Sequence, residues 1–173
     1  MTFTAGATMS TACAELETRP QSERFVPRKK ATRTSLLHCL VVAEDAERRE
    51  FLVEAARAAG WEVAAYDDAT AANSAAHRYR HALAIVDLAG LDPVAASRYR
   101  MLTEQLSATE PPLVMLCGNE ANPLEEIWAR QLGIWLYLPG VDTSCDLSTL
   151  CSEAKHVVQK LHPQGSPAYA RTA

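Results

Sequence analysis

Short apolar runs and amphipathic segments alternate along most of the chain. The apolar runs are rich in aliphatic residues, as expected of strands covered on both faces, and lie at residues 36–43, 61–66, 82–88, 113–117 and 134–138. The amphipathic segments place apolar residues at helical spacing and lie at residues 45–59, 69–79, 95–106, 123–132 and 147–161. This alternation predicts an α/β fold in which helical crossovers join five parallel strands.

Local signals at the ends of the segments agree with this pattern. Asp67 or Asp68 can cap the second helix, and Pro123 stands at an early helical position that suits proline. We therefore expect a flavodoxin-like, doubly wound sheet with strand order 2-1-3-4-5 and helices on both faces. In such sheets ligands bind at the carboxyl ends of the strands, beside the switch point between strands one and three. The ends of strands one, three, four and five are thus where a functional site is expected.

Composition and charge divide the chain into one domain and two tails. Residues 1–34 contain few large apolar side chains, and their six basic and three acidic residues give a net charge of +3. We expect a disordered N-terminal arm at residues 1–34, a globular domain at 35–162 and a disordered C-terminal tail at 163–173. The basic cluster RKKATR in the arm could dock on an acidic partner, although a solubilising tail is the simpler interpretation.

Several functional classes are disfavoured by the same sequence. The net charge of −4 favours neither nucleic acid nor an anionic membrane, and no apolar run is long enough to span a bilayer. The five scattered cysteines form no C-x-x-C pair, so we expect reduced thiols and a cytoplasmic protein. No glycine-rich phosphate loop or nucleophile elbow is present, and we expect no enzymatic activity.

Acidic residues mark the predicted strand ends. Glu44 and Asp45 follow the first strand, and Asp87 ends the third. Such carboxylates suit Mg²⁺, and a carboxylate beside magnesium can accept a phosphoryl group. The alternative is that these acids cap the following helices or face water.

The motifs around these acids resemble the response-regulator receiver family of two-component signalling. VVAEDAERREFLVEAARAAGWEV resembles its first strand, first helix and second strand, and ALAIVDLAGLDP its phosphoacceptor strand. PPLVMLCG and GIWLYLPGV resemble the fourth and fifth strands. The resemblance implies that Asp87 is the phosphoacceptor and that Mg²⁺ is the cofactor, held by Glu44, Asp45 and Asp87.

The same resemblance exposes departures that indicate a degenerate, or pseudo-receiver, site. The family's acidic pair falls on Ala43 and Glu44, and its switch hydroxyl falls on Cys117, a weak donor. Its lysine falls on Gly140, and no cation is expected to replace it. Tyr137 falls on the family's switch aromatic, where packing is the simpler role. A redox role for Cys117 would need nearby positive charge, whereas the neighbouring acids would raise its pKa.

These features predict a stand-alone receiver-like module that acts through protein contacts, with phosphorylation at Asp87 weakened or absent. Trp128 and Trp135 lie near the face that receivers commonly use, so they are candidates for binding a histidine kinase, another signalling protein or a second copy of the chain. On periodicity alone, both also fit a core role. Two alternatives stay open: a working phosphoacceptor in a phosphorelay, and a flavodoxin-like protein that binds a small ligand.

Overall fold

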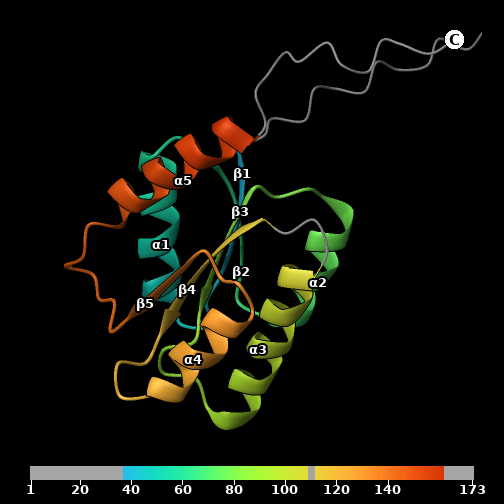
Figure 1. Ribbon diagram of the computed structural model, residues 1–173, viewed down its shortest axis with the longest axis vertical. Coiled ribbons are helices and arrows are strands. Elements are labelled where there is room, and N and C mark those ends of the chain that lie inside the picture. The colour runs from blue at the N-terminus through green and yellow to red at the C-terminus, as the bar shows by residue number, and fades with distance from the viewer. Residues whose placement is uncertain (1–36, 109–111, 162–173) are drawn as a thin grey trace, which may run out of the picture. The chain divides into compact units, whose positions relative to one another are not determined.

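The computed structural model describes residues 37–108 and 112–161, which form a three-layer α/β domain (Figure 1). The predicted arms at residues 1–34 and 163–173 lie outside this range. The strands are β1 (His38–Val42), β2 (Glu62–Tyr66), β3 (Leu83–Asp87), β4 (Leu113–Gly118) and β5 (Leu136–Pro139). The helices are α1 (Ala46–Ala58), α2 (Ala69–Arg78), α3 (Pro93–Ala108), α4 (Pro123–Gln131) and α5 (Leu147–Leu161).

All strand pairs are parallel, and their order is β2-β1-β3-β4-β5. The predicted flavodoxin-like topology is therefore confirmed. Because the order reverses between β1 and β3, the carboxyl ends of these two strands open beside each other. In the register of the sheet, Asp87 at the end of β3 lies opposite Cys117 on β4, and Cys117 lies opposite Leu138 on β5.

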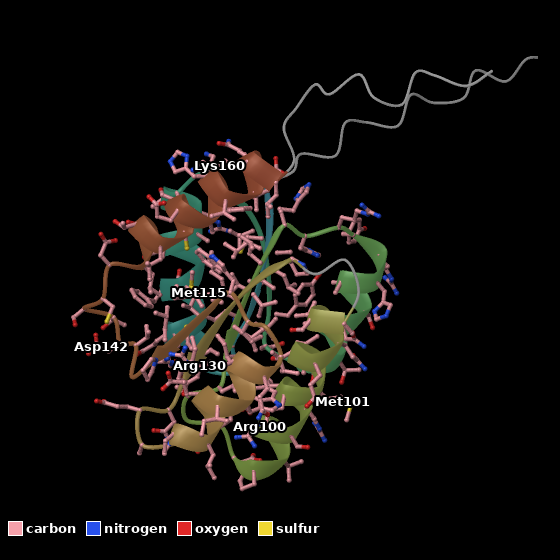
Figure 2. The ribbon with its side chains drawn as sticks, in the orientation of Figure 1. Arg100, Met101, Met115, Arg130, Asp142 and Lys160 are labelled. Atoms are coloured by element: carbon pink, nitrogen blue, oxygen red, sulfur yellow. The ribbon has the colours of Figure 1, made fainter. Side chains whose placement is uncertain are left out.

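Side chains of each strand alternate between the two faces of the sheet. Cys39 and Val41 of β1 belong to the core beneath α1 and α5, whereas Leu40 and Val42 belong to the core beneath α2, α3 and α4. Figure 1 shows these two helical layers on opposite faces, and Figure 2 shows Met115 of β4 within the interior. All of these side chains are fully buried, which explains why the strands read as continuous apolar runs.

The three tryptophans of the domain are buried to different degrees. Trp61 is buried, and its indole N–H donates to the Cys151 carbonyl of α5 at 2.9 Å. Trp128 and Trp135 are half-buried, and each packs against one of the two cores.

Among the described residues, no helix is both long and apolar enough to cross a membrane.

Candidate functional site

The candidate site lies at the carboxyl edge of the sheet, where Asp87 ends β3. Asp87 is only 2% exposed, although it is a carboxylate. Its Oδ1 accepts a hydrogen bond from the Ala89 backbone at 3.2 Å, and the next residue, Leu88, donates its N–H to the Cys117 carbonyl at 2.8 Å. A buried carboxylate must be paired, because leaving an ion without a partner in the interior is costly.

Arg48 of α1 supplies that partner. Its Nε donates to Asp87 Oδ2 at 2.5 Å and its second terminal nitrogen donates to Oδ1 at 3.0 Å, a bidentate ion pair. Its remaining terminal nitrogen donates to the Val141 carbonyl, just after β5, at 2.8 Å. The hydrogen bond to Asp87 raises the pKa of Arg48, although burial acts in the opposite direction.

This pair corrects the expectation that no cation replaces the family's lysine. The segment after β5 indeed lacks one, but Arg48 reaches Asp87 from α1 instead. The sequence motifs gave Arg48 no role, so this contact was not predicted. The available signal was its position: with Asp45 as the cap, Arg48 stands in the first turn of a helix that begins at the site.

The two other predicted metal ligands are engaged elsewhere or face solvent. Asp45 caps α1, and its Oδ1 accepts from the Arg48 backbone N–H at 2.8 Å. Glu44 is exposed, and its carbonyl, like that of Ala43, accepts a hydrogen bond from Arg49. Within the described parts of the chain, no group of three or more acidic, histidine or cysteine side chains is arranged to hold a metal ion. The helix-capping alternative therefore describes Asp45, and the residues present do not fit Mg²⁺.

Of the predicted switch positions, Cys117 lies opposite Asp87 on β4, Tyr137 lies on β5 and Gly140 follows β5. Cys117 is fully buried, and burial, followed by the nearby Asp87, raises the pKa of its thiol. The direction matches the sequence argument, although desolvation is the larger cause. A neutral, inaccessible thiol cannot serve as a reactive redox sensor.

Gly140 adopts a left-handed conformation, with φ of 64°. Its N–H donates to the Gly118 carbonyl at 3.1 Å, so the turn after β5 is tied to the end of β4. An added Cβ would lie 3.0 Å from the Glu120 carboxylate. This left-handed backbone conformation is strained for a residue with a Cβ, which makes the position unsuited to a lysine.

Tyr137 takes part in a polar cluster that the sequence did not reveal. Its hydroxyl donates to Glu125 Oε1 of α4 at 3.2 Å, and its ring packs against the core beneath α2, α3 and α4. Burial and the Glu125 charge raise the pKa of Tyr137 to about 12. The packing interpretation is consistent with this position, but the hydrogen bond adds a fixed orientation for the ring.

Glu125 is the centre of this cluster and is itself 5% exposed. It accepts from the Asn119 backbone at 2.9 Å and pairs with Arg100 of α3 at 3.2 Å. The Arg100 guanidinium in turn lies 5.6 Å from the centre of the Trp128 ring, and Trp128 donates to Glu104 at 3.3 Å. Arg100, labelled in Figure 2, thus links α3 to α4.

Comparisons with known proteins agree on the fold. No family model matches the chain, and no curated protein sequence does. Among solved structures, the chemotaxis protein CheY4 of Vibrio cholerae is 18% identical, with a TM-score of 0.54 over 67% of this chain and 97% of CheY4. A CheY-like receiver domain protein of Methanospirillum hungatei is 17% identical, with a TM-score of 0.59 over 76% of this chain and all of that one.

The receiver domain of NtrX from Brucella abortus gives a similar result, at 19% identity and a TM-score of 0.54 over 68% of this chain and 98% of that domain. The chain therefore has the fold of CheY-like receiver domains, as the sequence motifs implied. At these identities the likeness concerns the fold alone.

Proposed function

We propose that this chain is a receiver-like signal-transduction module that acts through protein contacts, with phosphorylation at Asp87 weakened or absent. The observation that carries the proposal is the bidentate pair between Arg48 and Asp87. Both carboxylate oxygens accept hydrogen bonds from a permanent cation. A carboxylate that attacks a phosphoryl group donates an oxygen lone pair to phosphorus, and charge-assisted hydrogen bonds from Arg48 to both oxygens lower the nucleophilicity of Asp87.

The surroundings of the pair support the same proposal. The Asp87 and Arg48 side chains are 3% and 25% exposed, so a phosphodonor would have to displace a partly buried arginine side chain to reach Asp87. A new phosphoryl group would add roughly two negative charges. Neither Gly140 nor Cys117 offers it a strong hydrogen-bond donor from a side chain, and the switch contacts would be weak.

A second candidate, the working phosphoacceptor, is favoured by one specific contact. Arg48 is a cation next to Asp87, and if its side chain moved aside it could pair with the phosphoryl oxygens. The two candidates therefore differ in whether Arg48 blocks or supports phosphorylation.

Intact mass separates the two candidates. The purified protein and its Asp87→Asn variant are incubated with Mg²⁺ and a small-molecule phosphodonor, beside a control receiver that has the family's full acidic pair and lysine. We expect an adduct on the control and little or none on the wild type under the same conditions. Labelling of the wild type to the same extent as the control, and absent from Asp87→Asn, would establish the phosphorelay alternative.

The proposed partner surface is the outer side of α4 with the adjoining β5. Leu124 and Ile127 are 73% and 52% exposed, and Trp128 lies half-buried beside them on α4. Exposed apolar side chains grouped on one helix are typical of a surface that another protein covers. A histidine kinase, another signalling protein or a second copy of the chain are the partners that this class of module would bind. Trp128 stands on α4 with Leu124 and Ile127, whereas Trp135 lies just before β5 and packs against the core beneath α1 and α5, so Trp128 is the better supported of the two predicted contacts.

A further inference from the structure

The carboxyl edge of the sheet contains a cation that is part of the protein. Mg²⁺ needs several oxygen ligands in near-octahedral geometry and normally binds through one or two carboxylates. Here Asp87 has both oxygens on Arg48, and Asp45 caps α1 with its Oδ1. A metal ion at Asp87 would have to compete with two charge-assisted hydrogen bonds from Arg48 and would place two cations side by side.

The Arg48 guanidinium is well suited to occupy the position beside Asp87 that a metal ion would take. Its planar fork matches the carboxylate, and its third contact, to the Val141 carbonyl, fixes the fork from the other side. Three segments meet at this one group: the first turn of α1, the end of β3 and the turn after β5. Because the cation is tethered to α1, its local concentration at Asp87 is far above that of any free ion.

We infer that Arg48 is a built-in cation that takes the place of Mg²⁺ at Asp87. The contacts among α1, β3 and the turn after β5 at the carboxyl edge of the sheet are then kept without a metal ion. The inference rests on the proposed function, since it gives the reason why phosphorylation at Asp87 would be weakened. It makes a separate claim, however, because metal binding can be measured without any phosphodonor.

The test is thermal unfolding with and without millimolar Mg²⁺ for the wild type, Arg48→Met and Arg48→Met/Asp87→Asn. Arg49→Met is the matched control, because Arg49 donates to the Ala43 and Glu44 carbonyls instead of Asp87. We expect Mg²⁺ to leave the Tm of the wild type and of Arg49→Met unchanged. Arg48→Met should lower the Tm by more than about 5 °C, and Mg²⁺ should restore part of this loss only while Asp87 is present.

Two results would overturn the inference. One is a saturable Mg²⁺ response of the wild type that Asp87→Asn abolishes. The other is an Arg48→Met protein that folds and is as insensitive to Mg²⁺ as the wild type, because Arg48 would then not be the group that excludes the metal.

If Arg48→Met does not fold, amide NMR spectra of the wild type with and without paramagnetic Mn²⁺ provide the test. Selective broadening of the Leu88 and Ala89 amide signals would overturn the inference, and unchanged signals would support it. Metal binding without a phosphoryl adduct would contradict this inference alone, whereas labelling of the wild type to the same extent as the control receiver would contradict the proposed function.

Discussion

At Asp87, the shape of the neighbouring cation matters as much as its charge. Arg48 makes three hydrogen bonds with three different nitrogens, two to the carboxylate and one to the Val141 carbonyl. A lysine in its place carries the same charge on a single nitrogen and cannot reproduce the bidentate contact. The pair therefore depends on an arginine at this position.

Replacing Arg48 by lysine should thus destabilise the domain although the charge is kept. We expect Arg48→Lys to lower the free energy of unfolding by about 1–3 kcal/mol, because at least one acceptor in a largely buried site loses its donor. Urea denaturation at neutral pH measures the loss, with Arg49→Lys as the neighbouring control. A variant as stable as the wild type would mean that charge alone maintains the contact.

The residues of the site were predictable in part. Asp87, Cys117 and Gly140 were located from their order along predicted strands, since each follows directly from where a strand ends. Arg48 was not, because its contact crosses from α1 to β3 and depends on the direction of a long side chain. Sequence spacing gives the position of a residue on an element, but not the distance that its side chain spans between elements.

Among the helices, α4 is attached to the domain by a buried acid. Glu125 accepts from Asn119, Arg100 and Tyr137, so it joins the β4–α4 connection, α3 and β5. At Gly118, an added Cβ would overlap the Glu125 carboxylate and the Tyr137 ring, which shows how closely these groups approach. The outer face of α4 is therefore presented by a helix with fixed internal contacts.

Two neighbouring glutamates of α4 provide a matched comparison. Glu125→Ala should cost about 2 kcal/mol, because three donors lose their acceptor. Glu126 is partly exposed and pairs with Arg130 one turn later, so Glu126→Ala should cost about 0.5 kcal/mol or less. Chemical denaturation of both variants tests the difference. Equal losses would show that the Glu125 cluster adds nothing beyond a surface ion pair.

The elements themselves were predicted closely, because periodicity and end signals are local. The last helix has the predicted bounds, Leu147–Leu161, and Asp68 is the cap of α2, with its side chain accepting from Ala71 at 2.8 Å. The third helix begins earlier than predicted, at Pro93, because Asp92 accepts from the backbone of Val94 and Ala95. Strand β5 begins later, at Leu136.

At the scale of the whole molecule, we expect the proposed partner to bind the outer side of α4, where Leu124 and Ile127 are exposed. Leu124→Ser/Ile127→Ser should abolish capture of the partner from an extract, while changing the free energy of unfolding by less than about 0.5 kcal/mol. Val94→Ser/Met101→Ser on α3 is the control, since these side chains are 64% and 56% exposed. The bound proteins are quantified by mass spectrometry. Equal capture by both double variants would place the partner surface elsewhere.

Folding also buries three thiols, Cys39, Cys117 and Cys151, in the core beneath α1 and α5. Burial raises the pKa of each, and that of Cys151 reaches about 11 from an ordinary value of 9.0. The folded state therefore holds these protons more tightly than the unfolded state does. Stability should be unaffected below the unfolded pKa and should fall as pH rises from about 9 towards 11, where the unfolded thiols ionise first.

This alkaline loss is the prediction that involves the whole fold. Cys151 alone should contribute roughly 2–3 kcal/mol across its window, since each pKa unit corresponds to about 1.4 kcal/mol. Urea denaturation at about pH 7 and about pH 10 measures the loss. Cys151→Ala should be less stable than the wild type at neutral pH but should lose less stability on going to alkaline pH, because one buried thiol is gone. A wild type whose stability stays constant through this range would mean that the core beneath α1 and α5 accommodates thiolates, contrary to the burial of these three cysteines.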